Sequence, residues 1–355
     1  MMKENYFPFH QALEDLGIHI FNEIADIEFK NSMNISTQLQ NNITLQEPTN
    51  NINSNEIKKK KNKIKSDKKQ RNHQLFEAII ESSSESRKKL LEISREKGSS
   101  IWLSTLPIKE EGFQIDKQSF WDLIKIRYGY QLTRLPNECA CGSKFNLEHA
   151  LSCKKGGFVT LRHNSIRDLT AKLLSEVCKD VSVEPTLHSL WGEALDGKTS
   201  NRKDEARLDI GARGFWISGQ KAFFDVRVFS PLAGRYRNSK ISNACELNAN
   251  EKKRQYNQRV LNTEHGSFCP LVFTAMGGMG RECKLFYKRL AELIADSRKE
   301  EISKTTTWIR RKVTFALMRS VVLCLRGSRI PWSKDHLPSS VSNSVSNCES
   351  LCSIN

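Results

Sequence analysis

Residues 206–229, ARLDIGARGFWISGQKAFFDVRVF, decide the fold of this chain. Both ends of the stretch are rich in β-forming residues, and residues 218–220 (SGQ) form a good turn centre between them. These features predict a β-hairpin. In its second strand Asp225 and Arg227 are two residues apart, so they project from one face of the sheet, while the hydrophobic residues that alternate with them project from the other.

A second carboxylate, Asp209, lies on the opposing strand within a few positions of register with Asp225. Two carboxylates on one sheet face can hold a divalent cation such as Mg²⁺, which activates water and stabilises the charge that develops on a phosphodiester. An Asp–Arg pair on a half-exposed sheet is more often a surface salt bridge. The hairpin alone therefore leaves both interpretations open.

The segments around the hairpin favour the catalytic interpretation. Upstream, a helical stretch opens at Arg162 and His163. Downstream, a polar helix carries Lys252, Lys253 and Tyr256.

Residues 270–275 (PLVFTA) predict a buried strand, and residues 282–297 predict a further helix. The order helix, hairpin, helix, strand, helix predicts an α/β fold with the acidic pair at its centre.

A compact group of metal-ligand residues lies upstream, in residues 139–153 (CACGSKFNLEHALSC). Zinc prefers four soft or borderline ligands in a tetrahedron, and three thiolates with one imidazole satisfy it. The expected ligands are Cys139, Cys141, His149 and Cys153. A set of four protein ligands leaves no open position, so we expect a structural zinc rather than a catalytic one. The alternative is a chance grouping of buried cysteines.

The composition indicates a polyanionic partner. The formal net charge is +16, which favours nucleic acid first and an anionic membrane surface second. The most apolar late stretch, residues 313–325, is too short to span a bilayer, and the first residues lack the apolar core of a signal peptide. The ten cysteines are scattered rather than arranged as a framework, which favours a reducing compartment.

The remaining segments are expected to be either helical or disordered. Residues 1–30 contain at most a short helix, residues 74–137 form a helical connector, and residues 301–330 form a C-terminal helix. Disorder is expected in the Asn-rich and Lys-rich linker, residues 31–73, and in the Ser-rich tail, residues 331–355. The lysine run of the linker is either a nuclear localisation signal or phosphate-binding arm, or a plain solvated linker. It begins with Lys58, Lys59, Lys60 and Lys61.

The order of these features resembles the C-terminal part of site-specific non-LTR (LINE-type) retrotransposon polyproteins. In that family a reverse transcriptase is followed by a zinc knuckle and a restriction-like endonuclease of the PD-(D/E)xK fold. Residues 99–135 also look like the connector that follows the polymerase, so the resemblance covers about residues 98–327. No polymerase precedes the connector in this sequence, and a fragment or a domesticated remnant of an element is expected.

The resemblance assigns roles to individual residues. Asp209 matches the first metal-binding Asp, and Asp225 matches the second acidic ligand, with magnesium as the implied ion. Arg162 and His163 match the Arg-His pair at the entry of the domain, where contacts to nucleic acid are expected.

The downstream Lys and Tyr positions match Lys252 or Lys253, with Tyr256. Two residues depart from the family pattern. Leu208 stands where the family has Pro, which is a conformational difference. Arg227 stands where the family has Lys, and because a guanidinium cannot easily lose a proton, it can stabilise charge but cannot act as a base.

The resemblance implies a zinc knuckle over residues 138–157 and an endonuclease with a restriction-like mixed sheet flanked by helices over residues 158–300. The implied function is a metal-dependent DNA endonuclease that nicks target DNA by phosphodiester hydrolysis, located in the nucleus, with DNA and also element RNA as partners. The alternative is a catalytically inactive nucleic-acid-binding remnant of such an element.

Overall fold

The computed structural model describes residues 54–188 and 206–329, and the chain divides into two compact units, residues 1–77 and 78–355. In the first unit the described residues form a helix, α3 (Ser54–Glu81), whose end extends into the second unit. This differs from the disordered linker expected over residues 31–73. Lysine is a good helix former and the segment contains neither Pro nor Gly, so the local propensity favours a helix.

Three other expectations lie outside the described residues. They are the short helix within residues 1–30, the Asn-rich first part of the linker before Ser54, and the Ser-rich tail over residues 331–355.

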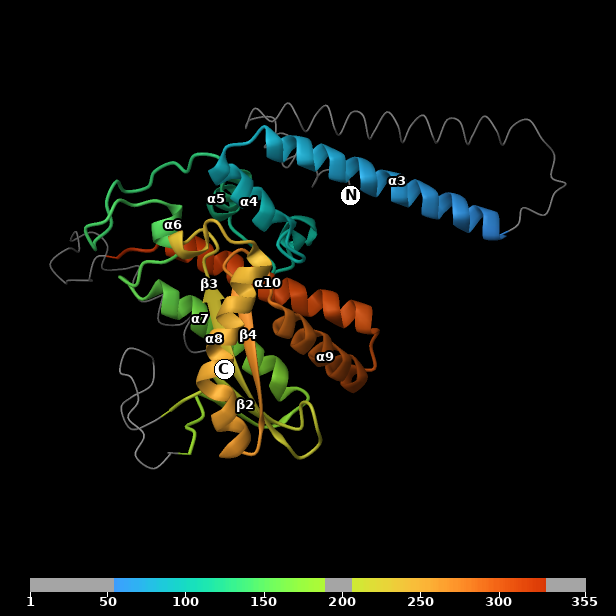
Figure 1. Cartoon of the computed structure of the whole chain (residues 1–355), viewed down its shortest axis with the longest axis vertical. Helices are drawn as coiled ribbons and strands as arrows, with labels where there is room; N and C mark the ends of the chain where they lie inside the picture. The colour runs from blue at the N-terminus through green and yellow to red at the C-terminus, as the bar shows by residue number, and fades with distance from the viewer. Residues whose placement is uncertain (1–53, 189–205, 330–355) are drawn as a thin grey trace. The chain divides into compact units, whose positions relative to one another are not determined.

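The second unit combines helices with one sheet (Figure 1). Its helical segments within the described residues are α4 (Glu85–Arg95), η1 (Ile101–Ser104), α5 (Lys117–Tyr128), α6 (Leu147–Ala150), α7 (Phe158–Ser175), η2 (Gly234–Tyr236), α8 (Ile241–Asn262), α9 (Arg281–Arg298) and α10 (Ile302–Arg326). The helical connector and the C-terminal helix expected from the sequence correspond to α4–α5 and to α10.

The sheet is mixed, with the strand order β1-β2-β3-β4. The first three strands pair antiparallel, and β3 pairs with β4 in parallel. A parallel neighbour requires a crossover, and α8 supplies it between β3 and β4. The strands are β1 (Lys179–Val183), β2 (Ile210–Arg213), β3 (Lys221–Phe229) and β4 (Ser267–Thr274). The α/β fold and the hairpin predicted from the sequence are therefore confirmed.

The central strand β3 has helices on both of its faces (Figure 1). Phe224 packs against Phe286 of α9, with ring centroids 4.8 Å apart. Asp225 and Arg227 project from the opposite face, where they contact α8. The face toward α9 is therefore hydrophobic, whereas the face toward α8 carries Asp225 and Arg227 beside a hydrophobic cluster in which Phe223 packs with Tyr256 and Val260 of α8.

None of the helices within residues 54–188 and 206–329 is long and apolar enough to cross a membrane.

Candidate active site and metal centre

The two predicted carboxylates face each other across the hairpin. Ile210 pairs with Phe224 in the antiparallel register. Asp209 precedes Ile210 and Asp225 follows Phe224, so the register brings these two residues opposite one another, at the end of the hairpin away from its turn. The hairpin predicted from the sequence therefore places the acidic pair as expected.

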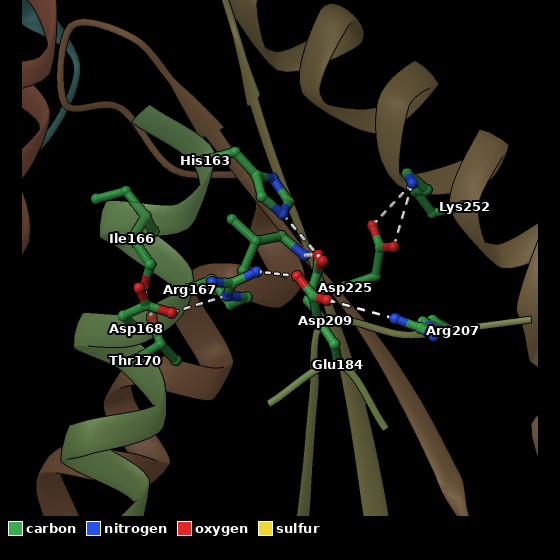
Figure 2. Close-up of polar contacts among 11 residues, drawn as sticks. His163, Ile166, Arg167, Asp168, Thr170, Glu184, Arg207, Asp209, Asp225 and Lys252 are labelled. Atoms are coloured by element: carbon green, nitrogen blue, oxygen red, sulfur yellow. Dashed lines mark hydrogen bonds and ion pairs between the residues drawn. The ribbon is translucent and has the colours of Figure 1, made fainter. Parts of the chain in front are cut away.

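Asp209 is fixed by two hydrogen bonds. Its Oδ2 accepts one from the backbone N–H of Val226, at 2.6 Å, and its Oδ1 lies 2.9 Å from Nε2 of His163 on α7. The backbone bond ties the Asp209 carboxylate to the strand that carries Asp225. His163, which is expected to contact nucleic acid, lies within hydrogen-bond distance of Asp209 of the acidic pair (Figure 2).

Asp225 is buried and pairs with Lys252 of α8. The Lys252 Nζ lies 3.1 Å from Oδ1 and 3.0 Å from Oδ2 of Asp225 (Figure 2). The net pKa of Asp225 is raised to about 6, because burial and the charge of Asp209, which raise the pKa, outweigh Lys252, which lowers it. Burial alone would lower the pKa of Lys252, but the charge of Asp225 outweighs burial, so the net pKa of Lys252 is raised.

The structure separates the two neighbouring lysines that the sequence could not distinguish. Lys253 forms an ion pair with Glu282 of α9, away from the acidic pair. Tyr256 is only 4% exposed and packs in a hydrophobic cluster, with the Lys252 ammonium 5.5 Å from its ring centroid. Of these three predicted residues, Lys252 contacts a carboxylate of the pair, and Tyr256 packs beside Lys252.

Arg162 has a different role from the nucleic-acid contact that was expected. It is 2% exposed, and its guanidinium donates to the carbonyl oxygen of Leu151 at 3.1 Å and to that of Val228 at 3.5 Å. Burial lowers the pKa of Arg162. Arg162 lies on the face of α7 that packs into the core, so its side chain cannot reach a phosphate at the surface.

The residues of the expected phosphate-binding arm, Lys58, Lys59, Lys60 and Lys61, lie in α3, and the structure does not describe their side chains.

Glu184, a charged residue next to the acidic pair, was not predicted from the sequence. The backbone N–H of Glu184 donates to the carbonyl oxygen of Asp209 at 2.9 Å. The Glu184 carboxylate pairs with Arg167 of α7, and its other oxygen lies 3.8 Å from Arg207 (Figure 2). Glu184 directly follows β1, a short strand that the sequence analysis did not predict. The weak alternation of residues 179–183 (KDVSV) was the available signal.

The four predicted zinc ligands come together. The ligand atoms of Cys139, Cys141, His149 and Cys153 all lie within 4.8 Å of one another, and these residues can hold a metal ion. Two sulfur–sulfur distances are 3.8 and 3.9 Å, and the distance from the Cys141 Sγ to the His149 Nε2 is 3.3 Å. Tetrahedral zinc with Zn–S bonds of about 2.3 Å requires sulfurs about 3.8 Å apart.

Local backbone geometry brings these ligands together. Gly142 has φ +82°, a left-handed conformation that lets the chain turn directly after Cys141. The Asn146 side chain caps α6 by accepting from the backbone N–H of His149 at 2.8 Å. Hydrogen bonds from the Ser143 side chain and backbone lower the pKa of the Cys141 thiol to about 6, which favours the thiolate that binds metal.

Comparison with known proteins adds no assignment: no family model matches this sequence, and no curated protein matches it significantly.

Proposed function

We propose that this protein is a metal-dependent DNA endonuclease of the restriction-like type, with a zinc knuckle, from a LINE-type retrotransposon. The observation that carries the proposal is the convergence of Asp209, which directly precedes β2, Asp225 of β3 and Lys252 of α8. Two carboxylates that can hold a divalent cation, next to a lysine, can activate water and stabilise the charge that develops on a phosphodiester.

The acidic pair fits a hard divalent cation such as Mg²⁺. The buried Oδ2 of Asp225 accepts no hydrogen bond, although Lys252 lies beside it as an ion pair. Carboxylate oxygens are the ligands that Mg²⁺ prefers in proteins. Asp209 and Asp225 would hold the ion, and the bound ion would supply a more acidic water and charge stabilisation at the phosphate.

Lys252 and His163 have separate roles beside the carboxylates. Because the raised pKa keeps Lys252 protonated at neutral pH, this residue acts first as a cation and hydrogen-bond donor toward the attacked phosphate, rather than as a proton acceptor. His163 orients the Asp209 carboxylate through their 2.9 Å hydrogen bond. Lys252 therefore takes the role of the family lysine, because this chain has Arg227 at the strand position where the family has that lysine.

The cysteine–histidine cluster supports a structural zinc ion. All four positions come from the chain, which leaves none for a substrate. A site of this kind stabilises the fold around residues 138–157, and it suits a protein in which the net charge of +16 favours DNA or element RNA as partner and the nucleus as location.

The test is nicking of a supercoiled plasmid by the purified full chain with Mg²⁺. Asp209→Asn, Asp225→Asn and Lys252→Met should each lower the nicking rate by about a hundredfold or more, since each removes a metal ligand or a charge-stabilising donor. Lys253→Met is the matched control, because Lys253 has the same chemistry but pairs with Glu282, and nicking should stay within about threefold of the unmodified protein.

The alternative, an inactive nucleic-acid-binding remnant, rests on Arg227 at the position of the family lysine. It would be supported if the protein bound DNA but nicked it with neither Mg²⁺ nor Mn²⁺. Equal losses in the Lys252 and Lys253 variants would contradict the assignment of Lys252.

A further inference from the structure

Arg227 projects from β3 into solvent, but one end of its guanidinium is fixed. Its Nε donates to Oδ1 of Asn248 at 3.2 Å. Asn248 is 1% exposed, and two more hydrogen bonds immobilise it: Oδ1 accepts from Oη of Tyr236 at 3.1 Å, and Nδ2 donates to the carbonyl oxygen of Ala244 at 2.7 Å. A buried amide that makes three hydrogen bonds therefore sets the direction of an exposed arginine.

The two terminal amino groups of Arg227 have no hydrogen-bond or ion-pair partner within residues 54–188 and 206–329. Arg167 of α7 differs, because its guanidinium pairs with Asp168 and Glu184. The partner of Arg227 is a neutral amide, so the positive charge is held in place without being neutralised. A guanidinium fork oriented in this way matches a phosphate, which it can bind through two parallel hydrogen bonds.

The position of Arg227 relates this fork to the acidic pair. Arg227 and Asp225 lie on the same face of β3 and are two residues apart, a step of about 6.6 Å along a strand. This is comparable to the separation of successive phosphates along one nucleic acid strand. A strand whose scissile phosphate lies at Asp209 and Asp225 would thus present its next phosphate to Arg227.

We propose that Arg227 binds the phosphate adjacent to the scissile one, and that Asn248 is a positioning residue that aims Arg227 at it. This inference rests on the proposed endonuclease function and adds a substrate contact to it. It also gives a reason why residue 227 is arginine rather than lysine: Lys252 already pairs with the Asp225 carboxylate, so residue 227 can bind the substrate phosphate instead.

The test measures the affinity of the full chain for a short fluorescent DNA duplex without added Mg²⁺, so it does not depend on cleavage. Arg227→Ala should lower the affinity about tenfold, the value of one charge-assisted contact. It should also make the slope of log affinity against log salt less steep by about 0.9, the value for one phosphate. Lys304→Gln, which removes an exposed charge at the start of α10, should leave the affinity nearly unchanged.

A double-mutant cycle tests the positioning role of Asn248. Asn248→Ala should weaken DNA binding, and in its background Arg227→Ala should cost clearly less than tenfold, because a fork that is no longer aimed contributes little. Tyr236→Phe is the graded comparison: Asn248 loses one of its hydrogen bonds but keeps those to Arg227 and Ala244, so the affinity should fall clearly less than in Asn248→Ala.

Additive effects of Asn248→Ala and Arg227→Ala, or an equal loss in Tyr236→Phe, would overturn the positioning role. An unchanged affinity and salt slope in Arg227→Ala would overturn the phosphate contact. Failure of the endonuclease proposal is a separate result, namely DNA binding with normal behaviour in this cycle but no nicking with Mg²⁺. If nicking occurs, Arg227→Ala should raise KM much more than it lowers kcat.

Discussion

Both carboxylate oxygens of Asp225 lie within 3.1 Å of the Lys252 Nζ, in a site where the Asp225 side chain is only 6% exposed. The pair joins the central strand to the helix that crosses over it. Its energetics are unfavourable for a purely structural contact, because burial raises the pKa of Asp225 to about 6 despite the ammonium beside it. A carboxylate kept in such a place is typical of functional sites.

The raised pKa predicts the pH dependence of nicking. Metal binding requires the ionised form of Asp225, so at subsaturating Mg²⁺ the rate should rise as the pH increases through about 6 and level off above it. Measuring initial nicking rates over roughly pH 5 to pH 8 tests this. The rise should move to lower pH as Mg²⁺ increases, because the metal ion competes with the proton. A flat profile at low Mg²⁺ would contradict the assignment of Asp225 as a ligand.

The same pair predicts an effect on stability. For Asp225 the folded pKa of about 6 exceeds its ordinary value of 3.8, so its favourable contribution is complete below 3.8 and is lost as the pH rises through 6. Lys252→Met leaves the buried carboxylate uncompensated and should lower the free energy of unfolding by about 3 kcal/mol at neutral pH. The double variant Asp225→Asn with Lys252→Met should recover this loss.

Urea unfolding of the two variants and the unmodified protein measures this coupling. A double variant as unstable as Lys252→Met would mean that the loss comes from packing of the lysine stem rather than from the unpaired charge.

The cysteine–histidine cluster predicts bound zinc that serves folding. Metal analysis of the purified chain should find one zinc ion per molecule, and Cys141→Ser should lose it together with the structure around residues 138–157. Cys178→Ser is the control, since Cys178 is a half-buried cysteine outside the cluster. Unmodified protein that contains no zinc, yet is folded as judged by its circular dichroism spectrum, would refute the site.

Local sequence patterns predicted the parts of the site that depend on short-range geometry. The two-residue period of β3 placed Asp225 and Arg227 on one face, and the ligand spacing predicted the metal cluster. The distinction between Lys252 and Lys253 was not accessible, because adjacent residues on a helix point about 100° apart and only the packing of α8 on the sheet decides which one meets Asp225. The Glu184 group was missed for a similar reason, since it depends on a five-residue edge strand.

Arg162 shows why motif order alone can mislead. In sequence it precedes His163 and resembles a contact to nucleic acid, but the two side chains leave α7 in different directions. His163 reaches Asp209, whereas Arg162 enters the core and binds the carbonyl oxygen of Leu151, just beyond α6. A second arginine, Arg329, donates to the neighbouring carbonyl oxygen of Ala150 at 3.2 Å. These two arginines attach the segment that carries the cysteine–histidine cluster to α7 and to the end of α10.

Arg162→Met should therefore act on stability rather than on DNA binding. It leaves the buried carbonyl oxygens of Leu151 and Val228 without their donor, which should lower the free energy of unfolding by about 2–4 kcal/mol. The DNA affinity of the folded protein should change less than twofold, as expected for a residue that touches no phosphate. Urea unfolding and fluorescence binding below the unfolding transition separate the two effects. Unchanged stability with a tenfold loss of affinity would instead restore Arg162 to the role that the motif implies, and would require its guanidinium to leave the core when DNA binds.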